Sequence, residues 1–241
     1  MRHFLFLIVF FAVSSVKADE VAVHKEVQWV TDSVEYAAIC AQTFRGAFAA
    51  VKGAVAEEKG PWAVVLDLDE TVLDNSTYQI ERYAQGLGYT PDSWGKWVER
   101  EEAVLVPGAR EFLDKVKALP GGKIVYITDR KAERDAHTIA NLKKFGLYDG
   151  KTHLLLARKD KPDNKEIRRA CVVSGKERCE GIGPRRIVAL IGDSVRDMIE
   201  LHGTENAAKA RAEAAADDSP WGVLYFQLPN PMYGSWERGY K

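Results

Sequence analysis

Residues 64–76 read VVLDLDETVLDNS, an aliphatic run that gives way to four carboxylates within eight positions. The run from Trp62 to Leu66 is short, continuous and apolar, which predicts a strand buried on both faces, as in a parallel sheet. Packing alone does not call for acids directly after such a strand. Their position therefore indicates a functional site.

Similar apolar runs recur along the chain and alternate with helical patterns. Residues 123–127, 153–156, 187–191 and 223–226 predict further strands, and residues 108–118 and 131–145 predict helices between them. Residues 27–51 carry apolar groups spaced by threes and fours, which predicts one long helix. Strands that alternate with helices indicate an α/β fold with a Rossmann-like parallel sheet flanked by helices.

Length and charge limit the alternatives. The chain has 241 residues, 46% of them hydrophobic, which suits one domain, and 34 basic residues nearly balance 35 acidic ones. No broad charged field or basic stripe therefore favours nucleic acid or an anionic membrane as a partner. Residues 76–107 are rich in Tyr, Trp and charge and fit the alternation poorly. We expect them to form a small cap lobe together with the N-terminal helix.

The N-terminus has the pattern of a secretory signal peptide. Arg2 precedes an apolar run from Phe4 to Val13, and residues 16–18 have the small-x-small ending of a cleavage site. The run is far shorter than the roughly 20 residues that span a bilayer. An uncleaved amphipathic anchor is the alternative. We expect cleavage near Ala18, leaving residues 19–241 as a single soluble domain that is secreted or periplasmic and has no lipid anchor.

Export to an oxidising compartment would also affect the cysteines. Cys171 and Cys179 lie eight residues apart, whereas Cys40 falls in a helical pattern. Either Cys171 and Cys179 form a disulfide that closes a small loop, or both remain free thiols.

Oxygen-bearing side chains stand at the ends of three predicted strands. Asp67 and Asp69 follow the first, Thr128 and Asp129 end the second, and Asp193 ends a later one. Carboxylates that converge repel one another unless a cation or proton intervenes, and oxygen ligands without His or Cys suit a hard ion such as Mg²⁺. A role in turns or helix capping is the alternative for any one acid taken alone. The recurrence at one end of several strands favours a metal site.

This pattern also suggests a reaction. An Asp beside a metal can attack phosphorus and form an acyl phosphate, and a second acid can protonate the leaving oxygen. A hydroxyl and a lysine are expected to hold the phosphate oxygens. Thr128 supplies the hydroxyl. Residues 159–168 contain three lysines, among which the residues alone do not choose.

Four motifs together resemble the haloacid dehalogenase superfamily, more narrowly the secreted class C (subfamily IIIB) acid phosphatases. They are DLDETVLD at 67–74, ITDR at 127–130, the lysine stretch, and GDSVRD at 192–197. Residues 29–36 (WVTDSVEY) and 228–237 (LPNPMYGSWE) resemble the flanking signatures of that family. The resemblance implies the haloacid dehalogenase fold, Mg²⁺ as cofactor and a homodimer.

The resemblance also implies a role for each matching residue. Asp67 would be nucleophile and metal ligand, and Asp69 acid/base and metal ligand through its backbone carbonyl. Thr128 would bind the phosphate, Lys165 would be the catalytic lysine because it lies three residues before an arginine, and Asp193 and Asp197 would complete the metal site. Trp94, Tyr233 and Arg130 would contact the substrate, the two aromatic groups by stacking on a base.

The sequence departs from the family pattern at several points. Asp129 stands where the family often has Asn, the lysine stretch is one residue longer so that Lys161 could replace Lys165, and the segment from Cys171 to Cys179 looks like an insertion. Trp94 could equally pack in the core of the lobe.

We therefore expect a phosphatase acting on small phosphate monoesters, nucleoside monophosphates among them. The rivals are a phosphotransferase that uses an acceptor alcohol and a non-catalytic storage or binding protein on the same fold. The presence of both Asp67 and Asp69 argues against the last.

Overall fold

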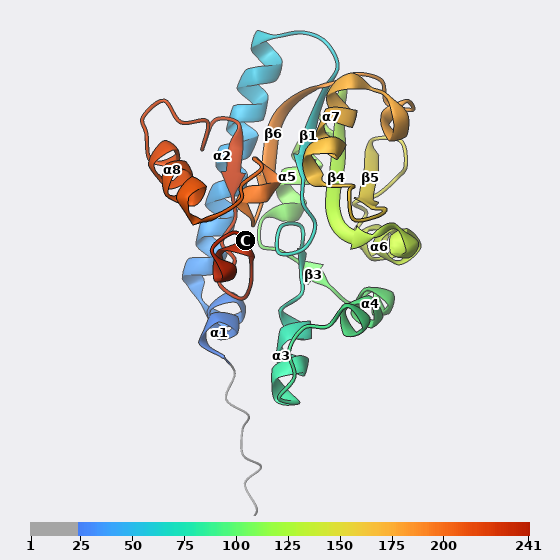
Figure 1. Cartoon of the computed structure of the whole chain (residues 1–241). Coiled ribbons are helices and arrows are strands. Elements are labelled where there is room, and N and C mark those ends of the chain that lie inside the picture. Colours follow the sequence, from blue (N-terminus) through green and yellow to red (C-terminus); the bar gives the residue numbers. More distant parts are fainter. Residues whose placement is uncertain (1–23) are drawn as a thin grey trace, which may run out of the picture.

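The computed structural model describes residues 24–241. The predicted signal peptide lies outside the described residues. The chain forms a five-stranded parallel sheet with helices on both faces (Figure 1). Its strands, in spatial order, are β5 (His153–Arg158), β4 (Gly122–Lys131), β1 (Trp62–Leu66), β6 (Arg186–Gly192) and β7 (Tyr225–Gln227). The predicted α/β class is confirmed.

In residues 24–241, eight α-helices surround or extend this sheet. They are α1 (Lys25–Asp32), α2 (Val34–Glu57), α3 (Ser76–Ala84), α4 (Pro91–Arg100), α5 (Ala109–Lys117), α6 (Asp135–Lys144), α7 (Lys165–Ser174) and α8 (Thr204–Ala214). Short 3-10 helices include η2 (Glu177–Cys179) and η3 (Val195–Asp197). Among the described residues, no helix combines the length and apolar character needed to cross a bilayer.

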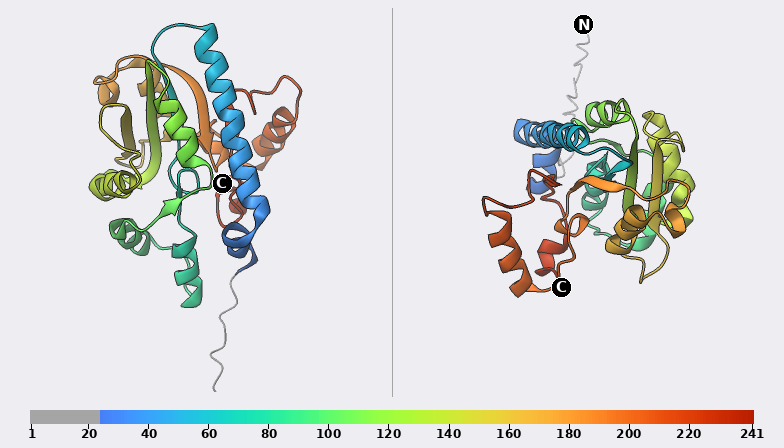
Figure 2. Two further views of the ribbon diagram at one scale, coloured as in Figure 1. Left: turned by 180° about the vertical axis from the view of Figure 1, so that it is seen from behind. Right: turned by 90° about the horizontal axis from the view of Figure 1, so that it is seen from above.

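The central strand β1 explains why both faces need covering. All five of its residues are buried, and they alternate between two apolar clusters. Trp62, Val64 and Leu66 face the cluster built with α2 and α5, visible from behind in Figure 2 as the blue and green helices. Ala63 and Val65 face the other cluster, which is covered by α7. This is the two-sided burial that a continuous apolar run predicts.

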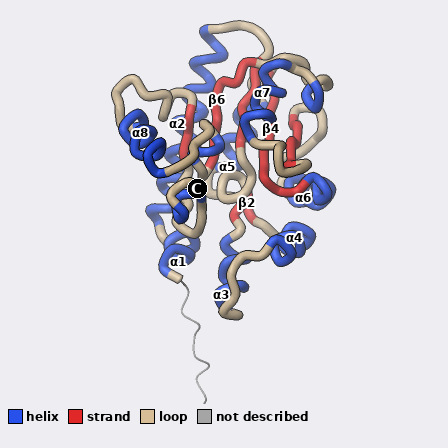
Figure 3. The backbone as a smooth tube through the Cα atoms, viewed as in Figure 1, coloured by secondary structure: helices blue, strands red, loops and turns tan. Residues whose placement is uncertain are grey.

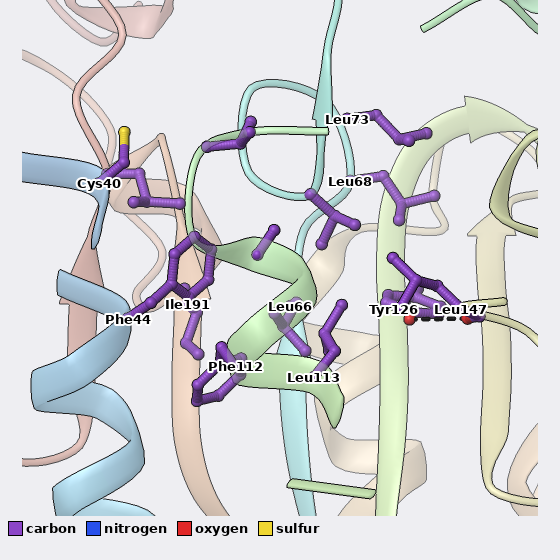
Figure 4. Close-up of a cluster of buried hydrophobic side chains, with 14 of the residues drawn as sticks. Cys40, Phe44, Leu66, Leu68, Leu73, Phe112, Leu113, Tyr126, Leu147 and Ile191 are labelled. Carbon is purple, nitrogen blue, oxygen red and sulfur yellow. Dashed lines mark hydrogen bonds between the residues drawn. The ribbon is translucent and has the colours of Figure 1, made fainter. Parts of the chain in front are cut away.

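Part of the larger cluster is drawn in Figure 4. Phe44 from α2 and Phe112 from α5 pack with ring centroids 5.3 Å apart, next to Leu66 and Ile191 of neighbouring strands. The hydroxyl of buried Tyr126 donates to the carbonyl of Leu147 at 2.9 Å. The packing of α2 and α5 on the sheet fixes the strands whose ends carry the acids.

The N-terminal helix differs from the prediction of one continuous helix over residues 27–51. It breaks at Ser33, whose backbone is extended and whose hydroxyl accepts the N–H of Tyr36 at 3.0 Å, as an N-cap does. The break resets the helical phase, so Val34 is 78% exposed, while α2 buries the side chains Tyr36, Cys40, Phe44, Ala47 and Val51. The serine cap outweighed the apolar periodicity.

Residues 76–107 extend from the carboxyl ends of the strands. The short β2 (Leu73–Asp74) pairs antiparallel with β3 (Val104–Leu105), and α3 and α4 lie between them in sequence. Figure 3 marks β2 between the large sheet and α3, and α1 packs against α3. The role of this segment and of α1 as a cap lobe stays a prediction.

Cys171 and Cys179 form a disulfide, so the first of the two alternatives holds. Their Cα atoms are 5.7 Å apart, and the bond joins α7 to η2. Both cysteines are buried, and Cys40 is a buried free thiol.

The double variant Cys171→Ser/Cys179→Ser is expected to lower the free energy of unfolding by about 2–3 kcal/mol, because the small loop would no longer be closed in the unfolded chain. Urea unfolding of the variant and the parent chain measures this difference. Alkylation of the unfolded parent chain should label Cys40 alone before reduction and all three cysteines after it. Three labels without reduction would contradict the disulfide.

Candidate active site

The sheet brings the predicted acids to one edge. Leu66, the last residue of β1, pairs with Tyr126 of β4 and Ile191 of β6. Asp67 therefore follows where β6 ends at Gly192, and just before the pairing of β4 with β5 becomes irregular after Thr128. Its backbone N–H still bonds to the carbonyl of Ile191 at 2.9 Å. Asp67 is therefore held by the sheet itself, and the residue is 7% exposed.

Three carboxylates from two strand ends meet here. Oxygens of Asp67, Asp193 and Asp197 lie within 4.8 Å of one another. Asp197 belongs to η3, which Ser194 caps, and it accepts the N–H of Ser194 at 2.9 Å. The segment after Ser194 is thus a single 3-10 turn. A Cβ on Gly192 would stand 2.1 Å from the Asp197 carboxylate, so only glycine leaves room for this acid.

Lys165 completes the cluster. It is the first residue of α7, which Asn164 caps by accepting the N–H of Ile167 at 2.9 Å. The ammonium nitrogen lies 2.5 Å from an oxygen of Asp67 and 2.5 Å from one of Asp197. Lys159 and Lys161 are exposed. Of the three lysines in residues 159–168, Lys165 is the one that lies beside these carboxylates, and its catalytic role stays a prediction.

The charges in this cluster do not balance. Burial lowers the pKa of Lys165, but attraction to Asp197 and Asp67 outweighs it and raises the pKa, so the lysine stays charged. Burial and repulsion by Asp197 raise the pKa of Asp193 to about 7. The hydrogen bond from the amide of Asn230 lowers this pKa but does not outweigh them. One lysine faces three carboxylates. An all-oxygen donor set with excess negative charge fits a hard divalent cation.

Thr128 and Asp129 lie within β4, which runs on to Lys131 instead of ending at residue 127 as predicted. Thr128 is fully buried, and Arg168 donates to its carbonyl at 2.6 Å. Arg168 also pairs with Asp129 at 2.8 Å. Burial raises the pKa of Asp129, but Lys165 and Arg168 outweigh it and lower the pKa. The acid that departs from the family pattern is thus neutralised by a buried arginine.

Asp69 points to a different set of partners. Its Oδ1 accepts from Arg130 Nη2 at 2.8 Å, Arg130 Nε at 3.0 Å and Asn75 Nδ2 at 3.1 Å. Its carboxylate is not one of the three that cluster at the metal candidate. Arg130 is 2% exposed, and its observed role is to hold Asp69. A metal contact by the Asp69 carbonyl and a substrate contact by Arg130 stay predictions.

The two aromatic candidates lie next to residues that bind the acids. The Trp94 ring has the Arg130 guanidinium carbon 5.9 Å from its centroid and packs edge-on against Tyr78 at 5.1 Å. The backbone N–H of Tyr233 donates to Asn230 Oδ1 at 3.4 Å, and Asn230 Nδ2 donates to Asp193 at 2.8 Å. Both rings are partly buried against the core.

Sequence reasoning gave no role to several amides of the site. Asn230 and Gln227 both donate to Asp193, the first to its carboxylate and the second to its backbone carbonyl. Asn75 contacts Asp69 and is fully buried. Asn75 directly follows the motif at 67–74 and Asn230 lies within the signature at 228–237, and this proximity was the only sequence signal for them.

Comparison with known proteins gives a consistent result. The family model described as HAD superfamily, subfamily IIIB (Acid phosphatase) matches residues 11–236. The solved class C acid phosphatase from Bacillus anthracis is 30% identical, with a TM-score of 0.76 over 90% of this chain and 88% of that one. A structure of the class C acid phosphatase from the same organism with tungstate bound is 28% identical, with the same TM-score and coverage.

Two curated soybean (Glycine max) proteins are also similar. The stem 28 kDa glycoprotein is 26% identical and a stem 31 kDa glycoprotein 28% identical, each over 170 residues. The matched region is 70% of this chain but only 58% of each soybean protein. Because the family model covers nearly the whole chain and the four motifs meet at one edge of the sheet, the chain belongs to the haloacid dehalogenase superfamily, subfamily IIIB, the acid phosphatase family.

Proposed function

We propose that the protein is a Mg²⁺-dependent acid phosphatase that hydrolyses small phosphate monoesters. The observation that carries this proposal is the position of Asp67. It follows the central strand, its oxygen lies 2.5 Å from Lys165 Nζ, and it shares a cluster with Asp193 and Asp197. A carboxylate beside fixed positive charge is suited to attack phosphorus, since the charge also stabilises the phosphate oxygens in the transition state.

The chain supplies groups for two balanced steps. An oxygen of Asp67 forms a bond to phosphorus while the bond to the ester oxygen breaks, and Asp69 gives its proton to the departing alcohol. Asp69 then takes a proton from water as the water oxygen attacks phosphorus. The bond between phosphorus and Asp67 breaks, which releases phosphate and restores both acids. Lys165 and Thr128 hold the phosphate oxygens.

Asp67, Asp193 and Asp197 would hold the cation, together with the backbone carbonyl of Asp69. A bound Mg²⁺ would offset the repulsion among the carboxylates and attract the phosphate oxygens. The related Bacillus anthracis protein binds tungstate, a tetrahedral oxyanion of the same shape as phosphate, which supports an oxyanion site.

We further propose nucleoside monophosphates as substrates and a secreted or periplasmic location. Trp94 and Tyr233 both lie next to residues that bind the acids, and a ring stacked on a base stabilises a complex by about 1–3 kcal/mol. The signal-peptide pattern of residues 1–18 and the Cys171–Cys179 disulfide support export.

A panel of phosphate esters assayed with and without Mg²⁺ tests the function. We expect hydrolysis of p-nitrophenyl phosphate and nucleoside monophosphates only with the cation, with lower KM for nucleotides than for glycerol 2-phosphate because of stacking. Added nucleoside distinguishes hydrolysis from transfer to an acceptor alcohol. Absence of phosphate release from every ester would refute the proposal.

A further inference from the structure

Asn75 is a fully buried amide whose two ends bind different kinds of partner. Its Nδ2 donates to Asp69 Oδ1 at 3.1 Å and to Glu70 Oε1 at 3.1 Å. Its Oδ1 accepts from the indole nitrogen of Trp97 at 2.8 Å and from Arg130 Nη2 at 3.4 Å. The side chain is therefore a link between the acid/base candidate and helix α4.

These partners leave one orientation for the amide. The Trp97 indole and the Arg130 guanidinium only donate hydrogen bonds, so they require the oxygen end. The carboxylates of Asp69 and Glu70 require the nitrogen end. If the amide were flipped, its NH₂ group would face the N–H donors of Trp97 and Arg130, and its oxygen would face the two carboxylates. Trp97, from α4, thus acts with Arg130, Asp69 and Glu70 to set which end of Asn75 faces Asp69.

Glu70 fixes the position of Asn75 as well as its orientation. The Asn75 backbone N–H donates to Glu70 Oε1 at 2.9 Å. Glu70 is 1% exposed and has a left-handed backbone, with φ 56°, and its N–H bonds to the carbonyl of Leu73 at 2.7 Å. A residue other than glycine or asparagine in this conformation is uncommon. The tight turn brings Asn75, the last residue of the DETVLDN segment, back to Asp69, the first.

The contacts on Asp69 distinguish its two oxygens. Oδ1 accepts three hydrogen bonds of 3.1 Å or less, from Asn75 and twice from Arg130, whereas Oδ2 has one contact of 3.3 Å with Arg130 Nε. We propose that Asn75 is the positioning residue that, with Arg130, occupies Oδ1 and leaves Oδ2 as the atom that transfers the proton. This inference rests on the proposed function, in which Asp69 is the general acid.

The inference can be tested through the leaving group of the ester. An alkyl phosphate releases an alkoxide that needs a proton as the bond breaks, whereas p-nitrophenolate leaves without one. Misplacing Asp69 should therefore slow the alkyl ester selectively. A general loss of folded structure would slow both esters alike.

The experiment compares kcat/KM for glycerol 2-phosphate and p-nitrophenyl phosphate in the Mg²⁺-loaded full chain. Asn75→Ala is expected to lower kcat/KM on the order of 10²-fold for the alkyl ester and less than about 5-fold for the aryl ester, because general-acid catalysis contributes 10²-fold or more. Trp97→Phe keeps an aromatic ring but removes the indole N–H, so the same selectivity is expected to a smaller degree.

Asn141→Ala is the matched control. Asn141 is 1% exposed and donates to the carbonyl of Ala103 at 2.9 Å, so its loss also removes a buried amide, but away from Asp69. In Asn141→Ala, the ratio of kcat/KM for the two esters should stay as in the parent chain. Asn75→Ser, which keeps a small hydrogen-bonding group and adds no charge next to Asp69 and Glu70, carries the test if Asn75→Ala does not fold.

If a folded Asn75 variant lost kcat/KM equally on the two esters, or lost none, the positioning role would be overturned. If the parent chain hydrolyses neither ester, the proposed function fails and the positioning role fails with it.

Discussion

Asp67→Asn is expected to lower the hydrolysis of p-nitrophenyl phosphate and nucleoside monophosphates by roughly 10⁴-fold or more, as removal of a nucleophile does in other covalent enzymes. The amide is a poor nucleophile and cannot form the acyl phosphate. It has nearly the same shape, and it removes one of three crowded carboxylates, so the fold should survive. Steady-state rates and thermal melting of the purified variant measure both effects.

Asp74→Asn is the matched control within the same motif. The Asp74 carboxylate accepts the N–H of Ser76 at 2.7 Å, a contact that an asparagine oxygen can also make. Its activity should stay close to that of the parent chain. A folded Asp67→Asn protein that keeps its activity would refute Asp67 as the nucleophile.

Removal of divalent metal with EDTA is expected to abolish hydrolysis, and added Mg²⁺ should restore it. A bound cation would balance the carboxylates that Lys165 alone does not, so it should also stabilise the fold. At 100 times the dissociation constant, the free energy of unfolding should rise by about 2.7 kcal/mol. Melting temperatures with and without MgCl₂ measure this independently of activity.

Asp193→Asn and Asp129→Asn separate the metal site from a general effect of charge. Asp193 lies in the carboxylate cluster, whereas Asp129 pairs with Arg168. Asp193→Asn should lose most of the Mg²⁺-dependent rise in melting temperature, and Asp129→Asn should keep it. Full hydrolysis in excess EDTA would show that no metal is required.

The sheet and the strand-end acids were predictable because each depends on local pattern. Continuous apolar runs identified the strands, and the rule that parallel strands end at one edge brought Asp67 and Asp193 together. The break at Ser33 was missed because a single side-chain cap outweighed the apolar spacing of a 25-residue window. β4 was underestimated because its polar end stays in the sheet through pairing of Lys131 with Arg158 of β5.

Contacts between distant residues limited the prediction of the site. Residue type alone could not distinguish Lys165 from the neighbouring lysines. Its place at the start of α7 puts its ammonium group beside Asp67, which lies 98 positions earlier in the sequence. Asn75 was unassigned because its partners Trp97 and Arg130 come from separate elements. The family resemblance pointed to Lys165 but gave no role to Asn75.

The order of the strands has a consequence for synthesis of the chain. The central strand β1 lies between β4 and β6, so one of its neighbours is complete at residue 131 and the other only at residue 192. Contacts of such high sequence separation form slowly, because long loops must close first. A nascent chain therefore cannot pair both edges of β1 until residue 192 of 241, about four fifths of the chain, has been translated. Ribosome-bound fragments that end before residue 186 should lack both the complete five-stranded sheet and the carboxylate cluster.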